Sequence, residues 1–228
     1  MSNTELIGTL NALGNSFNNL TLHGIHNQSS SGITTLNVSN SSFTNLSSSG
    51  IFNVGPLGTL NATANTFNNV ASGIVNDIGQ TVNTISVSQS GFTNISGFGV
   101  QNHRGIIENT FSVSHCSFDN VNPAGVGIFY DAATAPFDVS LEIIDNVFAP
   151  VTSPGTGYAV TVNMTQPAPS LLCLDFIGNS APVTSPAAYQ FTNTTETFNL
   201  TLGSDNSANT GEFSLSGSIG APGSCSAP

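Results

Sequence analysis

Hydrophobic and polar residues recur along the 228-residue chain with a period of about 25 residues, and a phenylalanine marks each period. The intervals between these anchors range from 24 to 30 residues and lengthen toward the C-terminus. A unit of this length cannot bury an apolar face alone, so the pattern predicts stacked units that share one continuous core. The anchors are Phe17, Phe43, Phe67, Phe92, Phe118, Phe148 and Phe176.

A short alternating segment precedes each anchor and predicts a β-strand. Seven positions before each of the first six anchors lies an apolar residue, and a second follows two positions later, so both side chains point inward. Because seven is odd, alternation cannot keep both the first apolar residue and the phenylalanine inside, so a bend or bulge lies between them. Asn15, Asn40, Asn65 and the Ser90-Gly91 pair occupy this region and supply turn chemistry. The inward pairs are Leu10 with Ala12, Leu36 with Val38, Leu60 with Ala62, Ile85 with Val87, Phe111 with Val113, and Leu141 with Ile143.

Two further short segments complete each unit. An aliphatic residue lies three positions after each of the first six anchors, and a glycine-aliphatic pair follows at 24–25, 50–51, 73–74, 99–100 and 127–128. No stretch of ten residues has helical periodicity. The pattern therefore predicts an all-β fold, a single-stranded parallel β-helix with about eight or nine rungs of about 25 residues. We expect regular rungs over 9–163, looser ones over 164–220, and a tail or linker over 221–228.

The repeated pattern, an apolar-x-apolar strand, then Asn-x-Phe-x-Asn-aliphatic, then Gly-Ile, resembles the parallel β-helix repeat of the pectate-lyase-like superfold. The resemblance implies a right-handed coil, in agreement with the strong preference of parallel crossover connections. The chain also resembles bacterial autotransporter passengers and chlamydial-type polymorphic surface proteins, although it carries Phe-x-Asn where the latter carry Phe-x-x-Asn. Many activities share the superfold, so function has to be argued from a site.

Asparagine recurs at two fixed positions of the unit. In a stack of parallel strands about 4.8 Å apart, equivalent amides lie above one another, and each can donate a hydrogen bond to the next carbonyl. Asparagine also tolerates the left-handed conformation that a sharp corner requires. The spacing predicts two asparagine ladders, one of Asn19, Asn45, Asn69, Asn94 and Asn120, and one of Asn27, Asn53, Asn76 and Asn102.

Charge narrows the range of partners. Only 6% of residues are charged, Arg104 is the single basic side chain, and the formal net charge is −11. Nucleic acid would be repelled, and basic patches for anionic membranes are lacking. No apolar run approaches the roughly 18 residues of a membrane span. The N-terminus has no secretory signal pattern, which suggests a start within a longer protein. We expect an extracellular or cell-surface location.

Candidate chemistry is sparse. Over the first six rungs, the outward position between the paired apolar residues carries an acid only once, at Glu142. No aligned carboxylate pair for glycoside hydrolysis is therefore expected. Lyases of this superfold use a basic side chain, and Arg104 is the one available. The best catalytic candidate groups Arg104 with His103 and Glu108, near Asp77 and Asp131; the alternative is a solvated surface loop.

The remaining histidines, cysteines and acids give no strong site. His23 and His26 lack a third ligand and are expected to be exposed loop residues. His115 should face outward and Cys116 inward, which prevents a catalytic pair. Asp145-Asn146 and Asp205-Asn206 are weak calcium candidates. Three cysteines, Cys116, Cys173 and Cys225, allow at most one bridge, with Cys116 the expected buried thiol. Neither a metal nor a cofactor is predicted.

The first expectation for function is a structural or adhesive β-solenoid segment of a secreted or cell-surface protein, which could assemble end to end into fibres. Its partners would be itself or the glycans or proteins of a host or cell surface, bound through loops around 102–108 and 131–137. The alternatives are a polysaccharide lyase or glycoside hydrolase on the same scaffold, and an ice-binding protein. Ice binding ranks last because outward threonines such as Thr44 and Thr93 alternate with asparagine.

Overall fold

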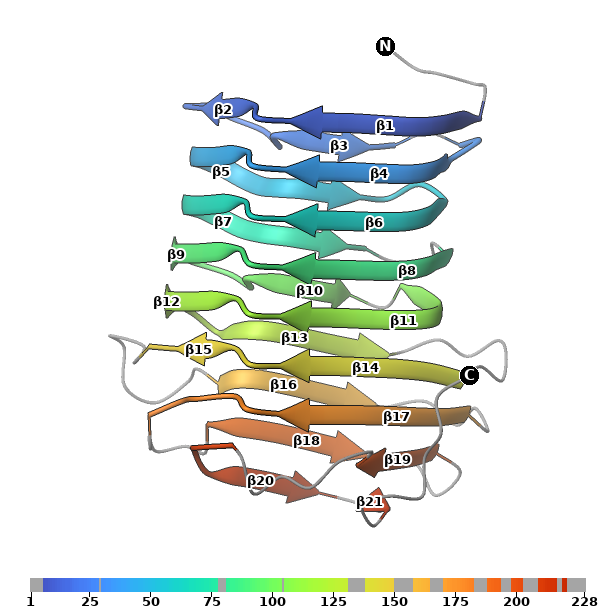
Figure 1. Cartoon of the computed structure of the whole chain (residues 1–228), viewed down its shortest axis with the longest axis vertical. Helices are drawn as coiled ribbons and strands as arrows, with labels where there is room; N and C mark the ends of the chain where they lie inside the picture. Colours follow the sequence, from blue (N-terminus) through green and yellow to red (C-terminus); the bar gives the residue numbers. More distant parts are fainter. Residues whose placement is uncertain are drawn as a thin grey trace.

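The chain coils into a column of parallel β-strands (Figure 1). The structure is a computed structural model, and it describes residues 6–28, 30–77, 81–103, 105–130, 138–149, 158–164, 170–182, 188–193, 198–202, 209–216 and 219–220. Its strands form a nine-stranded sheet, called the first sheet, and a twelve-stranded sheet, called the second sheet. The first sheet contains β1 (Ile7–Leu13), β4 (Ile33–Ser39), β6 (Leu57–Thr63), β8 (Thr81–Ser88), β11 (Ile106–Ser114), β14 (Asp138–Ile144), β17 (Ser170–Ile177), β19 (Phe198–Leu202) and β21 (Ile219–Gly220).

Each turn contributes one strand to the first sheet and up to two segments to the second. Near strands in Figure 1 run right to left, far strands run back, and successive turns descend, so the coil is right-handed as predicted. The second sheet contains β2 (Ser16–Asn18), β3 (Ile25–Asn27), β5 (Ser42–Asn53), β7 (Thr66–Asn76), β9 (Gly91–Ile95), β10 (Val100–His103), β12 (Ser117–Val121), β13 (Ala124–Tyr130), β15 (Val147–Phe148), β16 (Tyr158–Met164), β18 (Tyr189–Asn193) and β20 (Phe213–Ser216).

The number of complete turns is lower than predicted. Among the described residues, six turns carry all three segments, from β1 to β16. Beyond β16 the middle segment is reduced to single parallel bridges that link Val147 to Ser180 and Ser180 to Thr210. Strand pairing nevertheless continues to β21, so the looser C-terminal repeats still belong to the stack.

Phenylalanine rings form a column in the core. Six rings, from Phe17 to Phe148, stack with centroids 4.7 to 4.8 Å apart and ring planes within 10° of parallel. Phe176, the predicted seventh anchor, lies elsewhere: it pairs in register with Ile143 of the first sheet. The prediction failed because Phe176 occupies the second inward position of its strand, and Ala181 follows the Ser180 bridge where the column would continue.

The glycine of each glycine-aliphatic pair makes room for this column. Gly50, Gly73, Gly99 and Gly125 each lie against the phenylalanine ring of the next turn. The predicted fifth pair at 127–128 is two residues out of register, because Val100 pairs with Val126 and Asn102 with Ile128.

An asparagine ladder lies inside the column. The side-chain amide of Asn27 donates to the side-chain oxygen of Asn53 at 2.6 Å. Asn53 donates to Asn76 in the same way at 2.8 Å, and Asn76 to Asn102 at 2.7 Å. Asn102 ends the series by donating to the Gly105 carbonyl oxygen at 2.9 Å. These buried amides satisfy one another, which removes the cost of burying unpaired polar groups.

The other asparagine ladder lies at an exposed corner. Asn45 donates to Asn19 at 3.1 Å, Asn69 to Asn45 at 2.8 Å, and Asn120 to Asn94 at 2.9 Å. All five residues of this ladder have a left-handed backbone, with φ between 53° and 55°. Asparagine therefore serves both the corner and the stack, as the sequence predicts.

The predicted bend before each phenylalanine is a second left-handed corner. Asn40, Ala64, Gln89, His115 and Asp145 have φ between 51° and 55° there. The next residue of each turn joins a column in which a side chain accepts a hydrogen bond from the backbone of the preceding turn. This corner column consists of Asn15, Ser41, Asn65, Ser90, Cys116, Asn146, Asn179 and Asn209.

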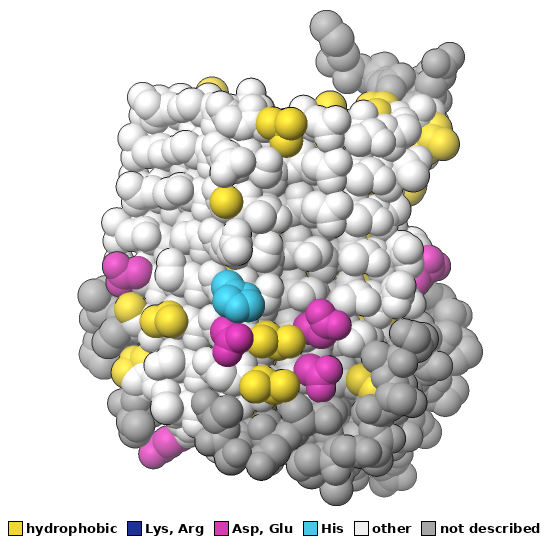
Figure 2. Space-filling model, in the orientation of Figure 1, with side chains coloured by type: hydrophobic (Ala, Val, Ile, Leu, Met, Phe, Trp, Pro, Cys, Tyr) yellow, Lys and Arg dark blue, Asp and Glu magenta, His cyan; other side chains and the backbone are white. Residues whose placement is uncertain are grey.

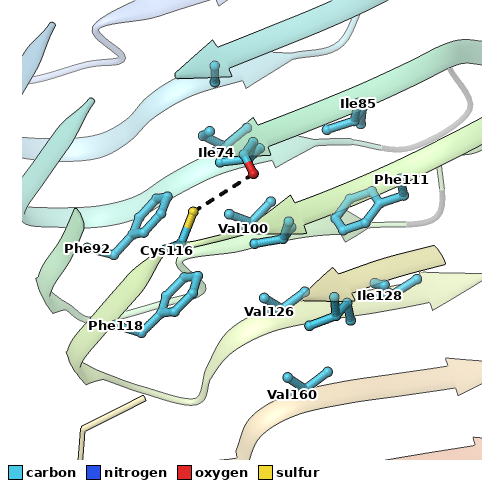
Figure 3. Close-up of a cluster of buried hydrophobic side chains, with 14 of the residues drawn as sticks. Ile74, Ile85, Phe92, Val100, Phe111, Cys116, Phe118, Val126, Ile128 and Val160 are labelled. Atoms are coloured by element: carbon cyan, nitrogen blue, oxygen red, sulfur yellow. Dashed lines mark hydrogen bonds between the residues drawn. The ribbon is translucent and has the colours of Figure 1, made fainter. Parts of the chain in front are cut away.

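Cys116 occupies the position that serine or asparagine holds in the other turns of the corner column. It points into the core between Phe92 and Phe118, and its thiol contacts the Val87 carbonyl oxygen at 3.8 Å (Figure 3). The thiol also donates to the Ser114 carbonyl oxygen at 3.3 Å. Cys116 is buried and free, as predicted, whereas Cys173 is disulfide-bonded. Cys225 lies outside the described residues.

Candidate functional site

A histidine–aspartate pair lies on the outer face of the second sheet. Asp77 follows β7, and His103 ends β10 one turn further along the column. His103 Nδ1 lies 2.8 Å from Asp77 Oδ1, and the two side chains remain 40% and 25% exposed. Asn76 and Asn102, the preceding residues, point inward into the buried ladder and hold both strand ends in register. This pair thus offers a fixed polar group to a ligand in solution.

Two half-buried phenylalanines lie beside this pair. Phe129 of β13 is in register with His103 of β10, so the two side chains are neighbours on the same face. The ring of Phe98, which precedes β10, meets Phe129 edge to face with centroids 5.4 Å apart. Both rings lie over Gly127, where a Cβ atom would collide with Phe98. We call Asp77, Phe98, His103 and Phe129 the aromatic–histidine patch.

The rest of the predicted catalytic group is not assembled among the described residues. Arg104 and Asp131 lie outside them, as does the predicted binding loop 131–137. Glu108 is exposed, in the β-bulge between Ile107 and Thr110 of β11, and within the described chain no hydrogen bond joins it to His103. Only the proximity of His103 and Asp77 is therefore seen.

The expectation that no carboxylates align was wrong. Glu142 of β14 and Asp175 of β17 are in register on adjacent turns, and both face outward. The acidic side chains gather low on the near face in Figure 2, around these strands. The prediction failed because Asp175 precedes Phe176, which was placed in the phenylalanine column and not on the first sheet.

His115 and Asp145 lie at neighbouring corners next to this pair. His115 Nε2 is 3.5 Å from Asp145 Oδ2, with both side chains mostly exposed. Ile144 and Ile177, which are also in register, separate this contact from Glu142 and Asp175 along the strands. His115 thus faces outward as predicted.

The paired N-terminal histidines are packed on a phenylalanine, which the sequence did not indicate. His23 stacks on the ring of Phe52 with centroids 4.3 Å apart and planes within 3°. Its Nδ1 lies 3.1 Å from the Ser48 hydroxyl. Burial, and to a lesser extent the charge of His26, lowers the pKa of His23. A neutral imidazole is therefore favoured in this stack.

A small cavity lies near the end of the phenylalanine column. An apolar cavity of about 20 Å³ lies where Phe148 meets Ala181, and it has room for roughly one water molecule. No group of three or more His, Cys, Asp or Glu side chains within the described chain could hold a metal ion. Asn146 belongs to the corner column, and Asp205-Asn206 lies outside the described residues. No described helix is long and apolar enough to cross a membrane.

Comparison with protein families, with curated proteins and with solved structures finds no match to the chain. The parallel β-solenoid is thus established by the strand pairing alone. These comparisons give no evidence for a pectate-lyase-like or autotransporter identity.

Proposed function

We propose that the chain is a rigid, adhesive β-solenoid segment of a secreted or cell-surface protein, and that its aromatic–histidine patch binds neutral glycans. The observation that carries the proposal is the placement of two aromatic rings beside a hydrogen-bonded His103–Asp77 pair on one outer face. Sugars present apolar C–H faces and a ring of hydroxyls, which suit aromatic rings and fixed polar groups respectively. The partially exposed pair can both donate to and accept from those hydroxyls.

Two features support the proposed secreted or cell-surface location and its neutral ligand. Cys173 is disulfide-bonded, and disulfides persist in oxidising compartments. The formal charge of −11 with one basic residue disfavours nucleic acid and leaves neutral ligands as suitable partners.

Self-association belongs to the same proposal. The described part of the first turn exposes five leucines: Leu6 is 65% accessible, Leu10 38%, Leu13 60%, Leu20 37% and Leu22 69%. Aliphatic side chains gathered at one end of a column favour contact with another apolar surface. Electron microscopy of the purified chain tests this: fibres support end-to-end stacking, and separate rods at all concentrations contradict it.

Glycan binding is tested on an array of neutral and acidic glycans. The unmodified chain should be retained by neutral glycans. His103→Ala and Phe98→Ala should each raise the dissociation constant roughly tenfold, a loss of about 1.4 kcal/mol in binding free energy. His26→Ala is a matched control, because this exposed histidine lies on the same sheet but outside the patch. Absence of retention, or equal losses in the control, would overturn the proposal.

The second candidate is a glycoside hydrolase, favoured by the in-register carboxylates of Glu142 and Asp175. One carboxyl group would protonate the leaving oxygen, and the other would act as nucleophile or base. Hydrolysis of polysaccharides that is abolished by Glu142→Gln and Asp175→Asn, but not by Glu108→Gln, would establish it. No turnover by the unmodified chain would exclude it.

A further inference from the structure

The outer face of the first sheet carries a regular array of neutral side chains. Outward threonines recur in register on five consecutive strands. The residues two and four positions further along each of β4, β6, β8 and β11 are asparagine, serine or threonine, for example Asn37 and Ser39 on β4. We call these outward positions of the four strands the threonine lattice. Its first row, extended by Thr9 of β1, is Thr9, Thr35, Thr59, Thr84 and Thr110.

The lattice is accessible and uncharged. Its side chains are half-buried or exposed, and the near face in Figure 2 is mostly white over the upper turns, with a few isolated hydrophobic side chains. The array ends at β14, where the equivalent positions are Ser140, which is buried, and the partly exposed Glu142 and Ile144. Acidic side chains thus gather toward one end of this face, whereas the exposed Leu13 of β1, in register with Ser39, lies at the other end.

Neighbouring contacts fix the lattice side chains. Asn61 donates to Asn37 at 2.9 Å, and Asn37 donates to Asn11 of β1 at 2.8 Å. The hydroxyls of Thr63 and Ser88 lie 3.1 Å apart. Threonine is also restricted at χ1 by its branched Cβ, so methyl and hydroxyl positions repeat from strand to strand. The array therefore needs little ordering when it meets a ligand.

The dimensions of the lattice identify its ligand. Equivalent residues on neighbouring strands repeat at about 4.8 Å, and alternate residues along a strand repeat at about 6.6 Å. Ice presents rows of oxygen atoms at comparable spacings, and an uncharged array of hydroxyls, amides and methyls can hold water molecules in such rows. We infer that the threonine lattice binds ice. This function is separate from the glycan binding proposed for the second sheet.

The sequence alone pointed away from this face. Thr44 and Thr93, whose alternation with asparagine argues against ice binding, both lie on the second sheet, in register with Asn68 and Asp119. The uninterrupted row lies on the opposite strands and becomes visible only once the strand register is known.

Ice binding is tested by recrystallisation inhibition, thermal hysteresis and partition into a growing ice hemisphere. The unmodified chain should be active in all three assays. Thr59→Tyr and Ser86→Lys place a bulky or charged group in the lattice and should remove most of the activity. Thr93→Tyr is the matched control, since this threonine is also outward but lies on β9 of the second sheet. Circular dichroism melting curves establish that each variant is folded.

The control should keep full activity if the inference holds. An unmodified chain no more active than an inert protein of equal concentration would overturn it, as would equal losses in Thr59→Tyr and Thr93→Tyr. Retention on an insoluble neutral polysaccharide, lost in Thr59→Tyr without any ice activity, would assign the lattice to that polymer and also overturn the inference. His103→Ala, which tests glycan binding, should leave ice activity unchanged.

Discussion

A Cβ atom added to Gly99 would lie 2.6 Å from Cε1 of Phe118 in the next turn and 2.7 Å from the Gly125 carbonyl oxygen. Gly99→Ala should therefore push the stacked ring or the strand aside and lower the free energy of unfolding by about 1–3 kcal/mol. Urea denaturation followed by circular dichroism measures the change. Gly91→Ala is the control, because the nearest atom to its Cβ is the Ser117 hydroxyl at 3.5 Å. Equal destabilisation by both would contradict the close packing.

The buried ladder should be far more sensitive than an exposed one. Asn76→Ala removes the acceptor of Asn53 and the donor to Asn102, and leaves both groups buried without that partner. We expect a loss of roughly 2–4 kcal/mol in the free energy of unfolding. Asn37→Ala breaks two similar bonds at the surface, where water replaces them, and should cost under about 1 kcal/mol. Similar costs at the two sites would show that ladder burial is unimportant.

Backbone conformation at the bend gives a stabilising prediction. Ala64 has φ of 55°, a conformation that disfavours residues with a Cβ atom, whereas glycine holds the equivalent Gly14 position. Ala64→Gly should raise the free energy of unfolding by about 0.5–1 kcal/mol. Thr63→Gly, one residue earlier within strand β6, should have the opposite sign. A loss of stability in Ala64→Gly would refute this account of the corner.

The Cys116 thiol should be unreactive in the folded chain. Burial raises the pKa of Cys116 to about 11. A thiol reagent at pH 8 should therefore modify Cys116 only after unfolding. Rapid modification under native conditions would contradict the burial.

The same shift predicts a pH dependence. From its ordinary value of 9.0 up to about 11 the unfolded thiol loses its proton while the folded one keeps it, so the free energy of unfolding should fall as pH rises through this range. Below it both states are protonated and Cys116 contributes no slope. Cys116→Ser, which restores the residue found at Ser90, should fold normally and reduce the slope. Burial also raises the pKa of Tyr189, so its titration should add a further fall in the free energy of unfolding as pH rises above its ordinary value of 10.0.

Much of the fold follows from local chemistry that repeats. The spacing of Phe43, Phe67 and Phe92 predicts the ring column, and the paired apolar residues before them predict the strands. Asparagine at Asn53 and Asn76 predicts a hydrogen-bonded ladder because only stacked equivalents could satisfy buried amides. These inferences depend on intervals along the chain, which sequence supplies directly.

The sequence pattern predicts less where the interval between repeats changes, or where residues of two different turns must be aligned. Phe176 looked like another anchor, yet one extra aromatic residue cannot reveal which inward position it fills. That error hid the alignment of Asp175 with Glu142. Likewise, the edge-to-face contact of Phe98 with Phe129 depends on Gly127, whose open space is a property of packing and not of spacing.

The corner column, from Asn15 to Asn209, keeps its hydrogen bonds although successive members are separated by as few as 24 and as many as 33 residues. All variation in turn length is therefore absorbed elsewhere in the turn. A foreign peptide inserted between Ala149 and Tyr158, which join β15 to β16 within the longest interval of the column, would leave this corner unchanged. The corner column is thus a constant hydrogen-bonded support, and the variable segments of each turn could carry different epitopes without changing it.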